Sequence, residues 1–494
     1  MPPKRRSLLP GQRNGAASDR EAERIGGDRS MTTFALFYGN RAFMPDEVID
    51  EARPQLEKAV KEAGCDFISM DVGQTSHGAA ETVREGKIYA RFLEENKGKF
   101  DGVIACLANF SDESAAVAAL KDCGVPILIQ ACPDEIGKMD FAGRRDAFCG
   151  KLAITDLFYQ YGIPFSLTQS HVVGLDSEEF KGELKKFGAV CRVVKNLRNL
   201  TVAAVGARVS AFKTMRFDEL TAQKYGITVE TVDLADFFLR MKSADPFSAE
   251  YKSRMEFYEN YADCTRVPAA SMDKMVRASL AADQVAAELE TDCMTIRCWD
   301  EFQREMQISV CSLVSELNER GIVTACELDL ANAICMKALS SASEQPAMCL
   351  DFNNNYGSEP DKCILFHCGP VCNTMMKDKG TIVEHKMFKK TMGDDVSWGV
   401  NQGTIRAMPM TYSSAKTDSG TIVAYVDNGE FVNDPIEAEY FGTGGVARIA
   451  DLQKKLYRIA KNGFRHHVSV SAGQNRDALV EAYRGYLGFE VMDL

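Results

Sequence analysis

Short apolar segments alternate with longer amphipathic segments from residue 31 to about residue 131. The apolar runs have the length of buried strands, and the segments between them repeat apolar positions at helical spacing. Strands separated by helices of this length pair in parallel through right-handed crossovers. The pattern therefore predicts a doubly wound sheet with strands at 32–40, 66–72, 100–108 and 125–131, and with helices at 47–63, 79–97 and 114–122.

A charged helical stretch at 177–197 ends this series, and the same alternation then begins again. It predicts a second doubly wound sheet, with strands at 200–208, 226–234 and 323–330 and with helices at 272–289 and 299–320.

Beyond about residue 345 the chain becomes rich in glycine, asparagine and threonine, and short strand-like runs follow one another. These runs predict antiparallel hairpins, with Asp427-Asn428-Gly429 as one turn and the glycines of 441–448 as another. We predict a mostly β, barrel-like domain with strands at 362–368, 381–388, 404–414 and 420–432, and with a helix at 475–486.

A chain of 494 residues exceeds what one hydrophobic core usually organises. We therefore predict an α/β protein in which two doubly wound parallel-sheet domains, at 31–172 and 173–345, precede a β-rich domain at 346–494. Residues 1–30 have almost no apolar content, and we interpret them as a disordered leader or tag. A basic binding arm is the alternative for this segment.

The composition excludes several classes of protein. No run reaches the roughly eighteen apolar residues that a membrane-spanning helix requires, and no apolar signal core follows the first charges. The sixteen cysteines are scattered singly, without a CxxC pair, which is typical of a reducing compartment and argues against a structural zinc site. We expect a cytoplasmic protein without a membrane partner.

The formal net charge is −12. Residues 1–30 contain seven Lys/Arg against four Asp/Glu, so the remaining chain carries −15. An acidic chain of this kind argues against nucleic acid as a partner.

Six histidines occur in the whole chain, so their placement is informative. His466 and His467 stand side by side at the start of a strand-like run, where alternation sends neighbouring side chains to opposite faces. At most one of them is then expected to point into a given pocket. The alternative is that one or both lie on a solvated edge.

Two carboxylates stand next to apolar segments. Glu327 lies among apolar residues, where an unpaired carboxylate is costly to bury, and Asp351 ends an apolar strand-like run. Each alone has a simpler explanation, as a helix cap or as a charge at a domain surface. Together with a histidine they supply the oxygen and nitrogen ligands that suit Mn²⁺, Co²⁺ or Mg²⁺.

Three separated motifs resemble one family. The segment CELDLANAICMKALSSASEQPAMCLDFNNNYGSEPDKCILFHCGPVCNT is similar to the catalytic stretch of the L-fucose isomerase and L-arabinose isomerase superfamily. FRHHVSVSAG resembles the late histidine motif of that superfamily, and GARVSAFKTMRFDE resembles a turn of its middle domain. The three motifs follow in the family's order over most of residues 200–475.

The resemblance implies a metal-dependent aldose-ketose isomerase. Glu327 and Asp351 match the two metal-binding carboxylates, which also serve as acid and base around an enediolate. His467 matches the late metal histidine, with His466 as its rival. His367 matches a ligand of the arabinose branch, or is a packed strand histidine. Mn²⁺ is the first choice of metal, ahead of Co²⁺ and Mg²⁺.

The resemblance further implies a homo-trimer or homo-hexamer, in which the N-terminal domain of a neighbouring subunit closes over the sugar. Arg41 and His77 are then candidates for substrate binding, and Arg41 is a plausible clamp for the anionic group of a sulfosugar. Trp299 is a candidate pocket wall or a core residue, and Arg216 either supports the pocket or forms a surface ion pair.

Two other functions stay open at this point. Paired α/β lobes also occur in sugar-binding sensors, which need no metal-liganding carboxylates. A metal-dependent sugar aldolase or epimerase would use the same carboxylates. Asp351 stands where arabinose enzymes carry glutamate, so the resemblance does not identify the sugar.

Overall fold

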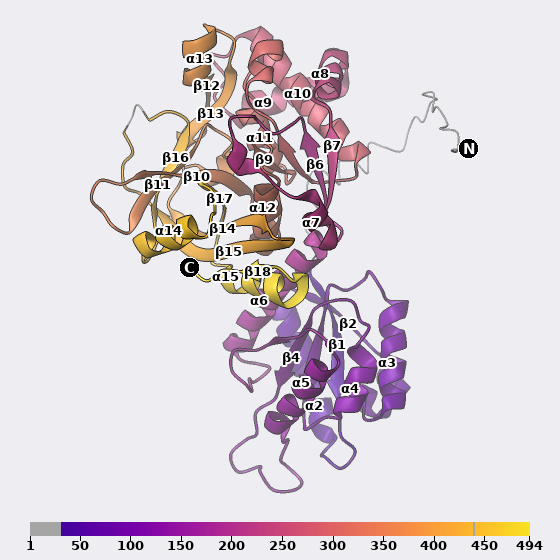
Figure 1. Cartoon of the computed structure of the whole chain (residues 1–494). Coiled ribbons are helices and arrows are strands. Elements are labelled where there is room, and N and C mark those ends of the chain that lie inside the picture. The colour runs from indigo at the N-terminus through magenta and orange to yellow at the C-terminus, as the bar shows by residue number, and fades with distance from the viewer. Residues whose placement is uncertain (1–30, 438–439) are drawn as a thin grey trace. The chain divides into compact units, whose positions relative to one another are not determined.

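The computed structural model describes residues 31–437 and 440–494. The predicted leader at 1–30 lies outside the described residues. The fold class is confirmed: two parallel sheets flanked by helices precede a large, mostly β region (Figure 1). The predicted boundaries after residues 172 and 345 stay predictions.

The N-terminal module is a five-stranded parallel sheet in the order β2-β1-β3-β4-β5. Its central strands are fully buried, as their continuous apolar runs require. The predicted strands and helices are confirmed, and the short β5 was not predicted. The elements are β1 (Thr33–Gly39), α2 (Glu47–Glu62), β2 (Asp66–Ser69), η1 (Val72–Gln74), η2 (Ser76–Gly78), α3 (Val83–Glu95), β3 (Gly102–Leu107), α4 (Glu113–Leu120), β4 (Ile127–Ala131), α5 (Ala147–Gln160), β5 (Ser166–Leu167) and α6 (Glu178–Leu197).

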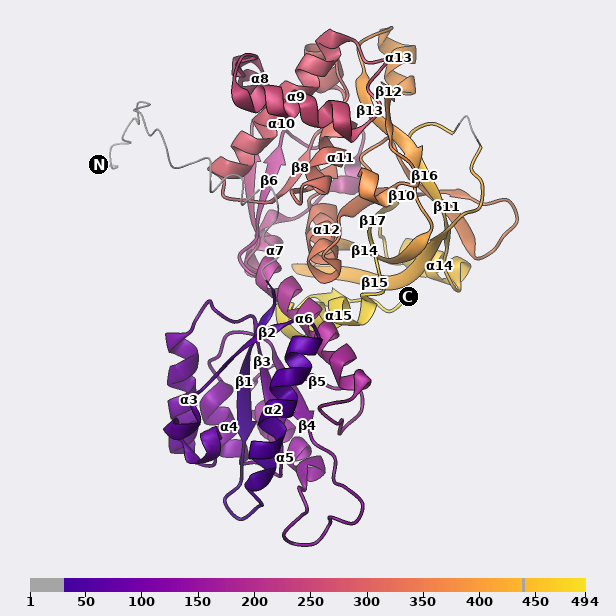
Figure 2. The same cartoon turned by 180° about the vertical axis from the view of Figure 1, so that it is seen from behind.

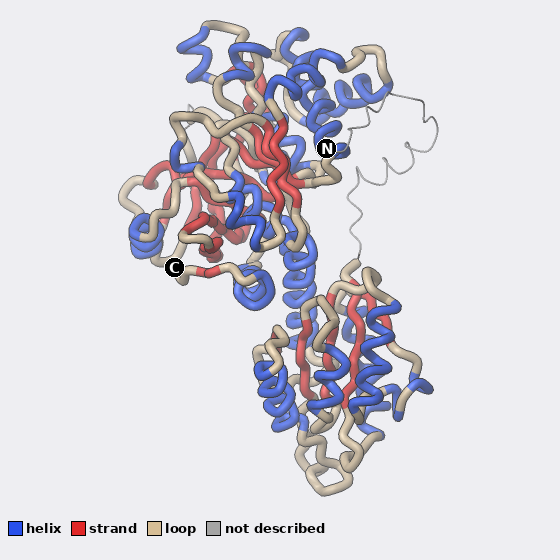
Figure 3. The backbone as a smooth tube through the Cα atoms, turned by 45° about the vertical axis from the view of Figure 1, so that its right-hand side comes forward, coloured by secondary structure: helices blue, strands red, loops and turns tan. Residues whose placement is uncertain are grey.

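The middle sheet has four parallel strands in the order β7-β6-β8-β9. Figure 3 shows its strands flanked by helices. The elements are β6 (Thr201–Val205), η3 (Lys213–Met215), α7 (Glu219–Lys224), β7 (Thr228–Val232), α8 (Leu234–Ser243), α9 (Ala249–Tyr261), α10 (Ala269–Glu288), β8 (Cys293–Ile296), η4 (Phe302–Met306), α11 (Cys311–Glu319), β9 (Val323–Cys326) and α12 (Leu330–Ser343).

Two predictions for this region were wrong. The helix expected at 299–320 is divided into η4 and α11, because Gln307 adopts a left-handed φ of 54° that ends the first segment. The strand expected at 323–330 stops at Cys326, because Glu327 and Leu328 also adopt positive φ and Asp329 already caps α12.

The C-terminal region contains a closed barrel. Six antiparallel strands follow one another in the order β16-β11-β10-β17-β14-β15, and pairing of β15 with β16 closes the ring (Figure 2). The elements are β10 (Ala347–Asn355), β11 (Lys362–His367), η5 (Asn373–Met375), β12 (Thr381–Glu384), α13 (Lys386–Met392), β13 (Trp398–Thr404), β14 (Met408–Asp418), β15 (Thr421–Val432), β16 (Thr443–Arg448), α14 (Leu452–Lys461), β17 (His467–Ala472), α15 (Arg476–Glu481), η6 (Ala482–Leu487) and β18 (Glu490–Val491).

Helix α12 connects the parts of the fold. It packs against β9 of the middle sheet, against α6, and against β14 and β17 of the barrel. Figures 1 and 2 both show it beside the barrel strands. Because it is surrounded on these sides, nearly every residue of α12 is buried. The residue before this helix, Asp329, is therefore held where the middle sheet meets the barrel.

Three predictions for the barrel region were wrong in detail. Asp427-Asn428-Gly429 is not a turn but part of β15, paired with β14. The hairpin turns instead at Ser419 and Gly420, whose φ values are 50° and 82°. The glycines expected as a turn at 441–448 lie largely in β16, and the strand expected at 381–388 gives way to α13 after Glu384.

Within the described chain, every helix falls short of the length and apolarity that crossing a bilayer demands.

The left-handed φ of Gly420, in the turn between β14 and β15, predicts that replacing glycine with alanine has opposite effects on stability at Gly420 and at Gly182. Gly420→Ala should lower the free energy of unfolding by roughly 1 kcal/mol, because alanine is strained at a φ of 82°. Gly182→Ala should raise it by about 0.5–1 kcal/mol, since Gly182 lies on the exposed face of α6, where a methyl group would meet no atom within 4 Å. Urea denaturation of both variants checks this, and equal shifts would contradict it.

Candidate functional site

The turn between β9 and α12 presents Glu327. Glu327 and Leu328 have φ values of 60° and 56°, in the left-handed region that side chains with a Cβ rarely occupy. Such residues cost of order 1–3 kcal/mol each and persist only where the surroundings hold them. Asp329 ends the turn by accepting the backbone N–H of Asn332 at 3.0 Å. This tight geometry buries the Glu327 side chain, which is 8% exposed.

Asp351 and His467 lie side by side in the barrel wall. They are register partners on the antiparallel strands β10 and β17, so their side chains share one face. The His467 Nε2 atom lies 3.4 Å from Asp351 Oδ1 and 3.6 Å from Glu327 Oε2. The structure thus brings three predicted residues together from the β9–α12 turn and two barrel strands.

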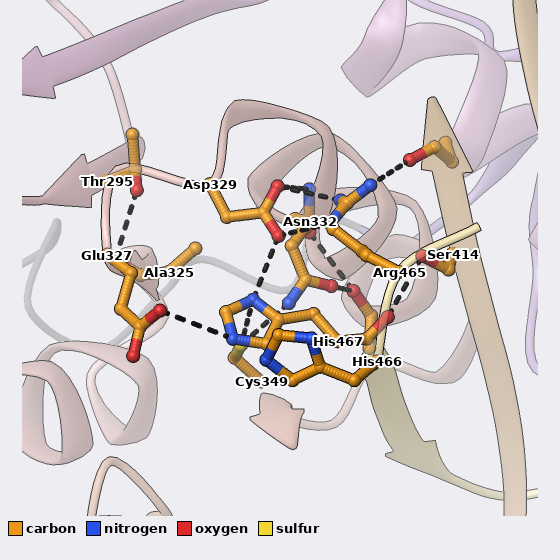
Figure 4. A network of polar contacts seen from close by, with 12 residues as sticks. Thr295, Ala325, Glu327, Asp329, Asn332, Cys349, Ser414, Arg465, His466 and His467 are labelled. Atoms are coloured by element: carbon orange, nitrogen blue, oxygen red, sulfur yellow. Dashed lines mark hydrogen bonds and ion pairs between the residues drawn. The ribbon is translucent and has the colours of Figure 1, made fainter. Parts of the chain in front are cut away.

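Asp329 and Arg465 orient the His467 ring, and sequence reasoning missed both. His467 Nδ1 lies 2.9 Å from Asp329 Oδ2, and the Arg465 guanidinium contacts both Asp329 oxygens at 2.6 and 2.7 Å. Figure 4 shows Asp329 between Arg465 and His467, with Glu327 beyond the other ring nitrogen. An acid two residues after Glu327 and an arginine directly before the histidine pair were the available signals.

The charge state of Asp329 decides the His467 tautomer. Burial alone would raise the pKa of Asp329, but Arg465 and His467 outweigh burial and hold that pKa well below its usual value. The carboxylate is therefore ionised and can only accept hydrogen bonds. A neutral His467 ring then donates to it from Nδ1, and its Nε2 lone pair faces Glu327 and Asp351. Carboxylate–histidine pairs of this kind orient imidazoles that bind metals.

His466 departs from the prediction that only one histidine points into the site. It lies in the bend before β17, so strand alternation does not apply to it. Its Nε2 is 3.7 Å from Asp351 Oδ1, although 47% of its side chain is exposed. The donor atoms of Asp351, His466 and His467 all lie within 4.8 Å of one another.

His367 is buried at the end of β11. Its ring centroid is 5.5 Å from that of His467, and its donor atom lies within 4.8 Å of those of Cys349 and His467. Burial lowers the pKa of His367 to about 4, so the ring is neutral. Its Nδ1 accepts the N–H of Cys368 at 2.9 Å, which leaves the proton on Nε2. That Nε2 has no hydrogen-bond partner in the described residues.

The carboxylates lack positive compensation. Burial raises the pKa of Glu327 to about 10, with further contributions from Cys298, Asp351 and Asp329. Asp351 Oδ1 is buried and accepts no hydrogen bond from the described residues. Arg465 is already engaged with Asp329. The donor atoms of Asp351, His466 and His467 could hold a divalent cation such as Mn²⁺, Co²⁺ or Mg²⁺, and Glu327 lies 3.6 Å from His467 Nε2 beside them.

The other candidates lie apart from this group. The Arg41 guanidinium pairs with Glu113 and stacks on Phe110 with 4.3 Å to the ring centroid. His77 pairs with Asp46 at 2.8 Å. These partners all belong to the N-terminal module.

The two candidates from the middle region differ in their surroundings. Arg216 follows η3 with an exposed side chain. Trp299 is half-buried and packs against Phe212, His385 and Phe388, with ring centroids 5.3, 6.2 and 5.0 Å away. Trp299 therefore belongs to an aromatic cluster near the end of β8.

Two protein-family models match the chain. The fucose/sulfoquinovose isomerase N-terminal domain matches residues 35–198, and the L-fucose isomerase C-terminal domain matches residues 365–494. A sulfoquinovose isomerase of Priestia megaterium is 21% identical over 398 residues, covering 80% of this chain and 86% of the relative. Sulfoquinovose isomerases of Alkalicoccus urumqiensis and a Clostridium species are 22% and 24% identical, covering 64% and 63% of this chain and 70% and 69% of the relatives.

The raised pKa of Glu327 predicts how pH affects the metal-free protein. The unfolded chain loses this proton near pH 4.3, whereas the folded protein keeps it up to about pH 10. Between these values the folded state keeps this proton and the unfolded chain does not, so the contribution of Glu327 to the free energy of unfolding falls as pH rises.

Glu327→Gln removes that titration. After treatment with a chelator, the wild type should lose stability relative to Glu327→Gln between pH 5 and pH 9, by at most about 1.4 kcal/mol per pH unit. Urea denaturation across this range measures the difference. Parallel curves for the two proteins would contradict the prediction.

Proposed function

The chain belongs to the fucose/sulfoquinovose isomerase family of aldose-ketose isomerases, and on this premise we propose that Glu327 and Asp351 are its acid-base pair. One observation carries the proposal. His467 Nε2 lies within 3.4 and 3.6 Å of oxygens of the two carboxylates, and this lone pair is oriented by Asp329 and Arg465. A mixed oxygen and nitrogen donor set around buried carboxylates is what a metal-assisted isomerase requires.

Glu327, Asp351 and His467 are the proposed metal ligands, with His466 as the alternative histidine. A divalent cation bound there, Mn²⁺ before Co²⁺ or Mg²⁺, would polarise the sugar carbonyl and offset the negative charge that develops on its oxygen. It would also keep Glu327 ionised, which burial in the metal-free site opposes. A carboxylate freed of its proton can act as a base.

The isomerisation moves two protons. One carboxylate takes the proton from C2 of the aldose and delivers it to C1, so that a planar enediolate lies between the two transfers. The other carboxylate moves the hydroxyl proton from O2 to O1. Each carboxylate ends as it began, and no oxidant is consumed. Glu327 is buried beside His467 Nε2, which places its carboxylate at a fixed point of the proposed site.

We assign His367 to the sugar rather than to the metal. A metal ligand must offer a lone pair, whereas the Nε2 of His367 carries a proton in the tautomer that Cys368 imposes. A buried N–H without a partner is costly. A sugar oxygen beside Asp351 would satisfy it.

The proposed substrate is a sulfosugar. The relatives with the highest coverage are named sulfoquinovose isomerases, and one family model carries the same sugar in its description. Arg41 is the residue proposed to bind the sulfonate, because its planar guanidinium group pairs with anionic oxygens. In this structure the guanidinium group pairs with Glu113, so a sulfonate would replace a carboxylate partner. His77, Trp299 and Arg216 are further proposed contacts of the substrate region.

We further propose a homo-trimer or homo-hexamer with shared sites. Among the described residues, the ion-pair partners of Arg41 and His77 belong to their own module, and we propose that these two residues serve the site of a neighbouring subunit. The same module exposes large apolar side chains that are suited to contact between subunits. They are Ile136, Met139, Phe141, Phe148, Leu152, Tyr159 and Tyr161.

The proposed compartment is the cytoplasm. All sixteen cysteines lie in the described part of the chain, and none of them forms a disulfide. Free thiols in this number are typical of a reducing environment.

Removing either carboxylate function should stop proton transfer. Glu327→Gln and Asp351→Asn are each expected to lower kcat for sulfoquinovose by at least about 100-fold. In D₂O the wild type should also place deuterium at C1 or C2 of the sugar, and both variants should lose this exchange. NMR of the products measures both quantities and separates isomerisation from aldol cleavage, which would shorten the carbon chain.

Asp427→Asn is the matched control. Asp427 lies on a barrel strand and is 17% exposed, close to the 19% of Asp351, but it pairs with Lys455 and Arg476 away from the site. It should keep kcat within about threefold of the wild type, because neither Lys455 nor Arg476 belongs to the proposed site. An Asp351→Asn variant as active as this control would contradict the assignment.

A shared site predicts complementation between two inactive variants. Arg41→Ala and Glu327→Gln should each be poorly active alone on sulfoquinovose. Mixed oligomers, made by unfolding and refolding the two together, should regain activity because some sites receive Arg41 from one chain and Glu327 from another. If Arg41 serves its own chain's site, every site lacks one group and mixing restores nothing.

A further inference from the structure

His385 is a buried histidine whose ring nitrogens are unpaired in the part of the chain that the structure describes. Its side chain follows β12 at the start of α13, and the residue is 1% exposed. Neither ring nitrogen has a hydrogen-bond partner in the described residues. Burial lowers the pKa of His385 to about 4, so the ring is neutral and offers one donor and one acceptor. Leaving both unpaired costs free energy that the protein must recover elsewhere.

The surroundings of His385 are aromatic. Phe388 and Phe441 lie 4.7 and 5.2 Å from its ring, and Trp299 lies 6.2 Å away. Its chain neighbour Glu384 is engaged with Lys389 at 2.8 Å. Among the described residues, His385 also belongs to no group of His, Cys, Asp or Glu that would hold a metal ion. The cluster of Trp299, His385, Phe388 and Phe441 therefore combines apolar ring faces with two ring nitrogens of His385 that have no partner among the described residues.

This cluster adjoins the proposed catalytic group. Trp299 lies just after β8, and Glu327 lies just after β9. These two strands are parallel neighbours in the middle sheet. Their ends are joined by the hydrogen bond that the Leu328 N–H donates to the Ile296 carbonyl at 3.3 Å. Phe441 packs against Phe366, the register partner of Asp351, with 5.7 Å between ring centroids.

We propose that His385 binds hydroxyl groups of the sugar remote from C1 and C2, with Trp299 and Phe441 against the carbon skeleton. A neutral imidazole matches a sugar hydroxyl, which both donates and accepts. Aromatic faces beside polar groups are typical of sites that hold small ligands. His385 is then a specificity residue that selects the sugar by its distal hydroxyls. This inference rests on the proposed isomerase function and adds a residue and a substrate feature to it.

Two substitutions separate a polar role from a packing role. His385→Phe keeps a ring and removes both nitrogens, whereas His385→Gln keeps a donor and an acceptor and loses the ring. If His385 binds sugar, His385→Phe should raise KM for sulfoquinovose roughly tenfold with kcat within about threefold, and His385→Gln should recover most of the loss. If His385 only packs, His385→Gln should be the more damaged protein.

Direct binding gives a readout that does not depend on turnover. The sugar alcohol made by reducing sulfoquinovose at C1 keeps the distal hydroxyls and cannot isomerise. The chain has two tryptophans, so Trp398→Phe leaves Trp299 as the sole reporter. In that background, quenching of Trp299 by the alcohol should yield a Kd raised roughly tenfold by His385→Phe.

His171→Phe is the control with the same chemical change. His171 lies in the N-terminal module, where its Nε2 contacts the Phe148 carbonyl at 2.8 Å, and its substitution should leave the Kd for the alcohol within about twofold of the wild-type value. Should His385→Phe fail to fold, as judged by its thermal midpoint, His385→Leu and His385→Gln make the same comparison.

Equal Kd values for the wild type and the apolar variant would overturn the inference. Failure of the proposed function is separate, because it would appear as a wild type that isomerises no sugar at all.

Discussion

The buried contact between Arg465, Asp329 and His467 determines the geometry of the site. Asp329 is held ionised by the guanidinium, and the ionised carboxylate in turn obliges His467 to donate from Nδ1. Only then does the Nε2 lone pair face Glu327 and Asp351. Without the arginine, a buried Asp329 would carry an uncompensated charge, which is strongly destabilising. One ion pair thus sets a ring orientation that the proposed metal centre requires.

The fold places this contact where three structural parts meet. Asp329 caps α12, and α12 packs on the middle sheet, on α6 and on the barrel strands β14 and β17. Glu327 precedes it in a left-handed turn, while Asp351 and His467 are register partners in the barrel wall. The proposed chemistry therefore depends on docking between sheet and barrel, and a small shift of α12 would separate the carboxylates.

The two sides of the proposed site carry different kinds of uncompensated polar groups. On the carboxylate side, burial raises the pKa of Glu327, and a bound metal would favour its ionised form. On the other side, the rings of His367 and His385 carry nitrogen atoms that have no partner among the described residues and that a polyhydroxylated ligand would satisfy. Such unpaired groups cost stability in the ligand-free protein, and functional sites are where proteins commonly carry this cost.

Sequence patterns predicted the two parallel sheets and the barrel-like end, and they drew attention to Glu327, Asp351 and the His466-His467 pair, from which the family resemblance chose His467. Periodicity reports burial directly, and charged residues inside apolar runs are conspicuous. The sequence did not show that Arg465 and Asp329 pair, that both histidines lie beside Asp351, or that His385 has no partner among the described residues. Those facts depend on contacts between residues more than a hundred positions apart and on the left-handed turn at Glu327. Only the folded chain decides such contacts, because they arise from how its sheets and barrel dock.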